Sequence, residues 1–159
     1  MNFIYLLLVS MILTFQGELI SYELIESFTK DEVQQSVDSD LGIVAPEIMY
    51  DVVMYKLKYY TIDPYGNQTV ASGVIAYPIN NNQAFPIISW QHGTEVKRDN
   101  VTSLRGFNLL NFVLTGSGYI FVEPDYLGLG DSEILHPYCL KEPSAWTKKI
   151  GRASCRERV

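Results

Sequence analysis

Two stretches decide the fold of this chain. Residues 85–94 read Phe-Pro-Ile-Ile-Ser-Trp-Gln-His-Gly-Thr, and residues 119–132 read Tyr-Ile-Phe-Val-Glu-Pro-Asp-Tyr-Leu-Gly-Leu-Gly-Asp-Ser. Each opens on a short apolar run, which is typical of a β-strand buried on both faces. Each run ends in a polar or Gly-rich loop. We therefore predict two core strands over 85–90 and 119–123, each followed by a loop that can carry chemistry.

The segment between these strands has helical periodicity. Apolar side chains recur at helical spacing, and the pair of glycines at 116 and 118 ends the pattern; the repeating positions are Leu104, Phe107, Leu110 (or Leu109) and Leu114. A strand, a helix and a strand in that order predict a parallel βαβ unit.

A β-hairpin is predicted before this unit. Residues 50–62 alternate in polarity, with Val53, Tyr55, Leu57 and Tyr59 on one face and Lys56 and Lys58 on the other. Asp63-Pro-Tyr-Gly-Asn67 is a strong turn signal, and residues 69–77 return as a second strand. The expected fold class is therefore α/β, with a sheet that begins antiparallel and continues as a parallel unit.

The region before the hairpin contains a helix signal. Thr29-Lys-Asp-Glu32 fits a capping box that opens a short helix over residues 32–37, and residues 38–46 are predicted to form a linker. We assign residues 18–49 to an N-terminal helical and linker segment and residues 50–149 to the domain itself.

Composition narrows the class of protein. The chain has 159 residues, of which 47% are hydrophobic and 19% are charged, so it has the composition of one globular domain and not of a disordered chain. The formal net charge is −6 and no basic cluster lies in the body of the chain, which argues against nucleic-acid binding. There are 2 cysteines, too few for a disulfide framework, and no apolar run is long enough for a stable membrane span.

Neither end is expected to belong to the fold. Residues 1–17 have the apolar stretch of a secretory signal peptide, with a cut near Gly17, although the stretch lacks a basic start; the alternative is a buried N-terminal helix. A signal peptide would make the protein secreted or periplasmic. Residues 150–159 back-translate to a string that resembles a common short-read sequencing adapter. We treat them as translated adapter sequence that is not part of the natural protein, with a genuine basic tail as the alternative. We expect the natural protein to continue past Lys149.

The two loops occupy the place where open parallel sheets bind ligands, beyond the carboxyl ends of the strands. The first reads Gln-His-Gly-Thr over residues 91–94, and the second reads Pro-Asp-Tyr-Leu-Gly-Leu-Gly-Asp-Ser over residues 124–132, with His-Pro-Tyr following at 136–138. This combination resembles the N-terminal half of α/β-hydrolases, and more narrowly it is similar to secreted bacterial esterases and lipases related to the secretory lipases. The resemblance covers about residues 50–147.

The resemblance implies roles for individual residues. The backbone N–H of Thr94 would be an oxyanion-hole donor, with Gly93 supplying the turn and His92 supporting the loop through its side chain. Tyr126 would face the cleft and shape the substrate site, and Asp125 would brace its loop. For each of these residues a plain structural role is the alternative.

The nucleophile is not found in this sequence. No two glycines lie four apart with a serine between them, so no Gly-x-Ser-x-Gly elbow is present, and Ser132 in Gly-Asp-Ser does not fit the motif. By resemblance the nucleophile lies one strand further on, and the triad histidine lies near the C-terminus of such enzymes, which argues against His136. His92-Gly-Thr-Glu95 has no second histidine, so a metal site is unsupported.

The function that the resemblance implies is hydrolysis of carboxylic esters, by an exported serine hydrolase that needs no cofactor. Its partner would be a small-molecule ester or lipid, and the chain alone would be inactive. Two alternatives stay open: a serine peptidase or acyl-peptidase of the same fold, and a non-catalytic binding protein of that fold. The oligomeric state is not indicated by the sequence.

Overall fold

The computed structural model describes residues 17–80 and 82–136. The predictions for the signal peptide, apart from Gly17, and for the adapter-like tail lie outside these residues. Five strands form one sheet: β1 (Leu19–Phe28), β2 (Val52–Ile62), β3 (Gln68–Pro78), β4 (Ile87–Ser89) and β5 (Ile120–Pro124). The helices are α2 (Lys30–Leu41), a short 3-10 helix η1 (Gly42–Val44), α3 (Thr102–Arg105) and α4 (Leu109–Gly116).

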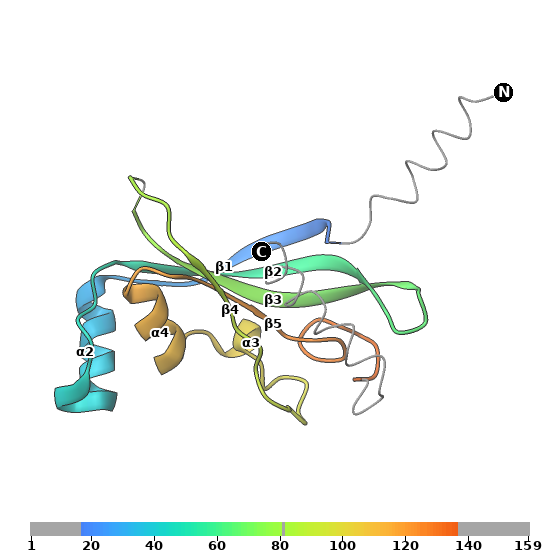
Figure 1. Ribbon diagram of the computed structural model, residues 1–159. Helices are drawn as coiled ribbons and strands as arrows, with labels where there is room; N and C mark the ends of the chain where they lie inside the picture. Colours follow the sequence, from blue (N-terminus) through green and yellow to red (C-terminus); the bar gives the residue numbers. More distant parts are fainter. Residues whose placement is uncertain (1–16, 81, 137–159) are drawn as a thin grey trace, which may run out of the picture.

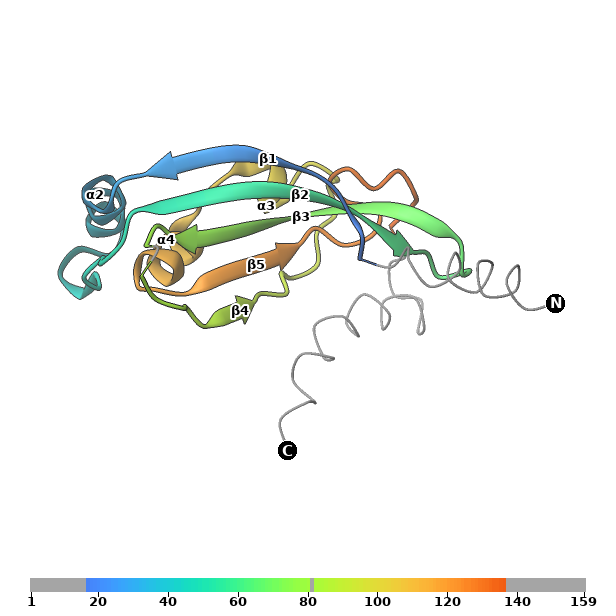
Figure 2. The ribbon, with the colours of Figure 1, turned by 90° about the horizontal axis from the view of Figure 1, so that it is seen from above.

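The sheet has the expected mixed topology. Its strand order is β1-β2-β3-β5-β4; the pairs β1–β2, β2–β3 and β3–β5 are antiparallel, and the pair β4–β5 is parallel (Figure 2). The predicted hairpin and the predicted parallel unit are both confirmed. Because β5 lies between β3 and β4, the two loops that follow the parallel strands emerge side by side.

Local sequence chemistry explains the elements that were predicted well. In the hairpin turn, the Asp63 carboxylate accepts hydrogen bonds from the N–H groups of Tyr65 and Asn67, each at 2.8 Å. At the start of α2, Thr29 and Glu32 form the capping box, with the Glu32 carboxylate 2.8 Å from the Thr29 N–H. The helix runs on to Leu41, so the first residues of the expected linker are helical.

A strand that the sequence analysis did not predict precedes this helix. Residues 18–49 were assigned to a helical and linker segment, whereas Leu19–Phe28 pairs with β2 along its length. Two register shifts interrupt β1, one between Leu19 and Ser21 and one between Leu24 and Glu26. Such bulges displace the alternation of polar and apolar residues, which explains why the sequence pattern did not reveal the strand.

The helix expected over residues 104–114 is two helices. Gly106, with φ at 80°, ends α3, and Asn108 then caps α4 through the N–H groups of Leu110 and Asn111. Leu104, which fitted the apolar period, is exposed on α3. The predicted end of the helix is confirmed, because α4 stops at Gly116.

The strand β4 is not buried on both faces as predicted. Its pattern is exposed, half-buried, exposed, and Ile87 is 68% exposed. The reason is position: β4 forms the edge of the sheet and pairs with β5 alone among the described residues.

The two faces of the sheet are covered unequally. The helices α2, α3 and α4 lie on one side (Figure 1), where two apolar clusters form the core. The first comprises Val33, Val37, Ile48, Val52 and Phe112, and the second Met54, Val74, Ala76 and Phe121. The other face carries Tyr22, 69% exposed, in edge contact with Tyr55. No helix within the described residues is long and apolar enough to cross a membrane.

Candidate functional site

Two loops meet at the carboxyl ends of the parallel strands. We call residues 90–101 the β4 loop and residues 125–136 the β5 loop. The Trp90 N–H still donates to the Val122 oxygen at 2.8 Å, so the β4 loop leaves the sheet directly beside β5. All five residues to which the sequence analysis gave a role lie in these loops: His92, Gly93, Thr94, Asp125 and Tyr126.

His92 fastens the start of the β4 loop. One ring nitrogen, Nδ1, lies 2.8 Å from the Gly93 oxygen, and the other, Nε2, lies 3.3 Å from the backbone oxygen of Asp125. The ring also packs on the Tyr126 ring, with centroids 4.2 Å apart. Both ring nitrogens therefore face backbone carbonyls, an arrangement that suits support of the loop.

Gly93 and Thr94 are both exposed in this loop. Among the described residues, no hydrogen bond involves the N–H of Thr94, so this donor is free for a ligand. A Cβ placed at Gly93 would meet nothing within 4 Å, and the φ of Gly93 is not in the left-handed region. We expected a tight turn to require glycine at position 93, but the backbone conformation at Gly93 does not require one. The space beside it is open, which lets a bound group approach the backbone.

Asp125 is the centre of a buried polar cluster that the sequence analysis did not find. Its side chain is 1% exposed, and Oδ2 accepts hydrogen bonds from the Ser72 hydroxyl at 2.5 Å and the Ser103 hydroxyl at 2.6 Å. Ser72 Oγ in turn accepts from the Asp131 N–H at 2.9 Å. The cluster joins β3, α3 and the β5 loop, so the hydrogen bonds of Asp125 link these three parts of the chain.

Burial changes the acidity of this region. Desolvation raises the pKa of Asp125, opposed by the hydrogen bonds from Ser103 and Ser72 and by the charge of Lys56. Glu123, two residues earlier on the same face of β5, also has a raised pKa because it is buried, while a hydrogen bond with Thr102 and the charge of His92 lower it. Burial and the charge of Asp125 together raise the pKa of Tyr59 to about 12.

Gly130 allows the β5 loop to close over Asp125. Its φ is 57°, in the left-handed region, and a Cβ there would overlap both Asp125 Oδ2 and Ser72 Oγ. The loop therefore needs a glycine at this position for two reasons: the backbone conformation and the space.

We predict that Gly130→Ala lowers the free energy of unfolding of the complete protein by about 2–4 kcal/mol, since it adds backbone strain to an overlap in the core. The measurement is urea unfolding. Gly66→Ala is the matched control, because Gly66 has a φ of 88° but open space around its Cβ position. Equal losses in the two variants would show that the overlap with Asp125 and Ser72 is not a constraint.

Arg98 connects the far end of the β4 loop to the β5 loop. Its Nε donates to the Gly130 oxygen at 3.1 Å, and its Nη2 donates to the Ser132 oxygen. In return, the Gly130 N–H donates to the Arg98 oxygen at 2.9 Å. Nothing in the local sequence pattern marked Arg98.

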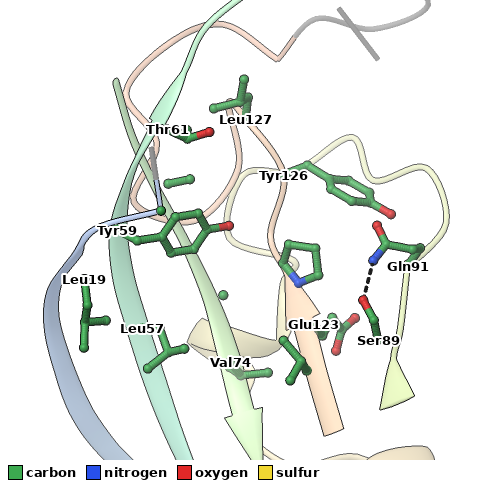
Figure 3. A pocket seen from close by; sticks show the side chains of 15 residues that line it. Leu19, Leu57, Tyr59, Thr61, Val74, Ser89, Gln91, Glu123, Tyr126 and Leu127 are labelled. Atoms are coloured by element: carbon green, nitrogen blue, oxygen red, sulfur yellow. Dashed lines mark hydrogen bonds between the residues drawn. The ribbon is translucent and has the colours of Figure 1, made fainter. Parts of the chain in front are cut away.

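Tyr126 lies between the β4 loop and a pocket on the sheet. It is the one residue other than glycine within the described ranges that has a positive φ, 68°, and its hydroxyl donates to the His92 oxygen at 3.1 Å. The pocket has a volume of about 270 Å³, and Tyr126 and Gln91 lie together on one side of it (Figure 3). The remaining lining is mainly apolar and includes Leu57, Tyr59, Val122, Pro124 and Leu127.

The residues set aside in the sequence analysis do not form a second site. Ser132 is fully buried, so its hydroxyl is inaccessible to an ester. His136 contacts the Leu127 oxygen through Nδ1. Within residues 17–80 and 82–136, no three His, Cys, Asp or Glu side chains are grouped so that they could hold a metal ion.

Solved structures resemble this arrangement. A Legionella pneumophila protein provisionally classed as a hydrolase is 33% identical over 86% of this chain, with a TM-score of 0.66. The rice cell wall degrading esterase LipA from Xanthomonas oryzae is 26% identical in a ligand-bound structure and 25% identical in a second crystal structure, over 87% of this chain, with TM-scores of 0.69 and 0.66. This is the fold of an α/β-hydrolase.

The resemblance to α/β-hydrolases of the esterase type, which rested on the two loops, is thereby confirmed for the part of the fold that this chain contains. The chain spans 40% of the length of the Legionella protein and 38–39% of the LipA chains. No protein-family model and no curated protein matches the sequence.

Proposed function

We propose that this chain is the N-terminal part of a serine hydrolase that acts on carboxylic esters. The observation that carries the proposal is the free, exposed N–H of Thr94 beside the open space at Gly93, in a loop that leaves the sheet next to β5. The esterase among the solved structures supports the choice of ester over other substrates. Export through residues 1–17 belongs to the same proposal.

The chemistry assigns this chain one task. A serine hydroxyl, contributed by sequence outside these 159 residues, attacks the carbonyl carbon of the ester while a histidine takes its proton. The carbonyl oxygen becomes negative in the tetrahedral intermediate, and the N–H of Thr94 donates a hydrogen bond to it. The C–O bond to the alcohol then breaks, the histidine returns the proton to the leaving alcohol, and water releases the acid from the acyl-enzyme.

Two features of the site suit this task. A preorganised donor stabilises the developing charge without reorganising during the reaction, and the loop that carries Thr94 is fastened at His92. The apolar pocket beside Gln91 and Tyr126 offers a place for the acyl or alcohol group. The residues of this chain bind the ester and position the Thr94 donor, and none of them acts as the nucleophile.

The test is the activity of the complete reading frame that contains this chain. We expect hydrolysis of p-nitrophenyl butyrate, and labelling of one serine, in a Gly-x-Ser-x-Gly sequence, by a fluorophosphonate probe. Faster cleavage of an aminoacyl p-nitroanilide would favour the peptidase alternative. A reading frame without such a serine, with neither labelling nor hydrolysis, would favour a binding protein of this fold and overturn the proposal.

A further inference from the structure

Residues 93–97 are exposed apart from Glu95, which is half-buried and accepts a hydrogen bond from Asn100 within the same loop. The two ends of this segment are attached to the same neighbouring loop. At its start, the His92 oxygen accepts from the Tyr126 hydroxyl at 3.1 Å, and the His92 ring packs on the Tyr126 ring. At its end, Arg98 donates to the oxygens of Gly130 and Ser132. A short segment held at both ends has far fewer conformations than one held at one end only.

We propose that Arg98 is a positioning residue that fixes the N–H of Thr94 by clasping the β4 loop onto the β5 loop. This inference rests on the proposed function. The clasp is three hydrogen bonds in one place, because the Gly130 N–H also donates to the Arg98 oxygen at 2.9 Å. The planar guanidinium presents two N–H groups in a fixed fork, which matches two carbonyls of one loop.

The β5 loop is a rigid partner for this clasp. Gly130 lies over the buried cluster of Asp125, Ser72 and Ser103, and Ser132 is fully buried. Lys56 adds an ion pair with Asp131 at 2.7 Å, between the two carbonyls that Arg98 contacts. Arg98 therefore attaches the β4 loop to residues of the β5 loop that are themselves anchored to the buried cluster and to Lys56.

The arrangement also accounts for the strained conformation of Tyr126. A non-glycine residue with a φ of 68° is held there only if its surroundings favour it. Here the conformation coincides with the ring contact to His92 and the hydrogen bond to the His92 oxygen. Tyr126 and Arg98 thus act at opposite ends of the same segment, and Thr94 lies between them.

The test uses the complete protein and the variants Arg98→Ala, Arg98→Lys and Lys97→Ala. Lys97 is the matched control, since it is an exposed neighbouring cation whose side chain makes no hydrogen bond or ion pair with any described residue. We expect Arg98→Ala to lower kcat for p-nitrophenyl butyrate about 10- to 100-fold with little change in KM, because a displaced donor affects the transition state more than substrate binding. Arg98→Lys recovers only part of kcat, since an ammonium lacks the fork.

Two further readouts separate positioning from general stability. Ethylguanidinium added to Arg98→Ala is expected to restore part of kcat, and hydrogen exchange of peptides spanning the β4 loop and Gly130 is expected to accelerate in this variant but not in Lys97→Ala. An unchanged kcat in Arg98→Ala would overturn the proposal. So would a loss of kcat that follows loss of folded protein and shows no rescue by ethylguanidinium.

The exchange measurement also keeps the two proposals distinguishable. If the complete protein hydrolyses no ester, the proposed function fails, and exchange alone then decides whether Arg98 orders the loop. Unaltered exchange across the β4 loop in Arg98→Ala would overturn the clasp even in an active enzyme.

Discussion

The 159-residue chain by itself is expected to hydrolyse p-nitrophenyl butyrate no faster than buffer does. Its sequence has no Gly-x-Ser-x-Gly, and the one histidine of the β4 loop directs both ring nitrogens at backbone oxygens. An oxyanion donor without a nucleophile stabilises an intermediate that never forms. The difference in esterase activity between this chain and the protein made from the complete reading frame is therefore the largest effect that we expect.

The measurement compares the purified chain with an empty-vector preparation taken through the same purification, which sets the background. Low solubility is expected as well, since β4 presents an edge with no partner strand among the described residues and Ile87 is 68% exposed. Circular dichroism of the soluble fraction shows whether the chain is folded when assayed. Turnover above background in a folded sample would contradict the argument that the nucleophile is missing.

The parts of the fold that the sequence revealed are those with a local cause. The Asp63 turn and the Thr29 capping box are each completed by side chains within four residues, so a short stretch of sequence contains the whole interaction. The break between α3 and α4 was also local, at Gly106 and Asn108, but the apolar period across it masked the signals.

The parts that the sequence did not reveal depend on distant neighbours. β1 is a strand because β2 pairs with it, and β4 is exposed because of its place at the edge of the sheet. The lysine-bearing face of β2 illustrates the same limit. Met54 on that face is fully buried in the core under the helices, and Lys56 reaches Asp131. The alternation was predicted correctly, but only the tertiary structure shows which face the helices cover.

The same distinction holds within the candidate site. His92, Gly93, Thr94, Asp125 and Tyr126 lie in motifs that a reader of the sequence can recognise. Ser72, Ser103 and Arg98 lie outside them, 53, 22 and 32 positions from their partners Asp125, Asp125 and Gly130. One weak signal existed for Ser72, a small polar residue within an apolar strand. The residues that support a site are therefore harder to predict from sequence than the loop residues that would contact the substrate.

Replacing Thr94 by proline in the complete protein is expected to lower kcat for p-nitrophenyl butyrate by about 10²–10³-fold, which corresponds to about 3–4 kcal/mol. Proline removes the N–H. The φ of Thr94 is not positive and the preceding Gly93 has open space around its Cβ position, so neither of these features excludes proline. Neither the N–H nor the side chain of Thr94 makes a hydrogen bond with any described residue, so folding loses no interaction there.

Thr94→Ala is the control that isolates the backbone donor. It removes the side chain and keeps the N–H, so its kcat is expected to stay near that of the unaltered protein, and both variants are expected to unfold at the same temperature. If alanine and proline lower kcat equally, the side chain is responsible and the assignment of the N–H is wrong. If neither lowers kcat while ester hydrolysis is intact, the oxyanion is stabilised elsewhere, and the β4 loop then has a structural role alone.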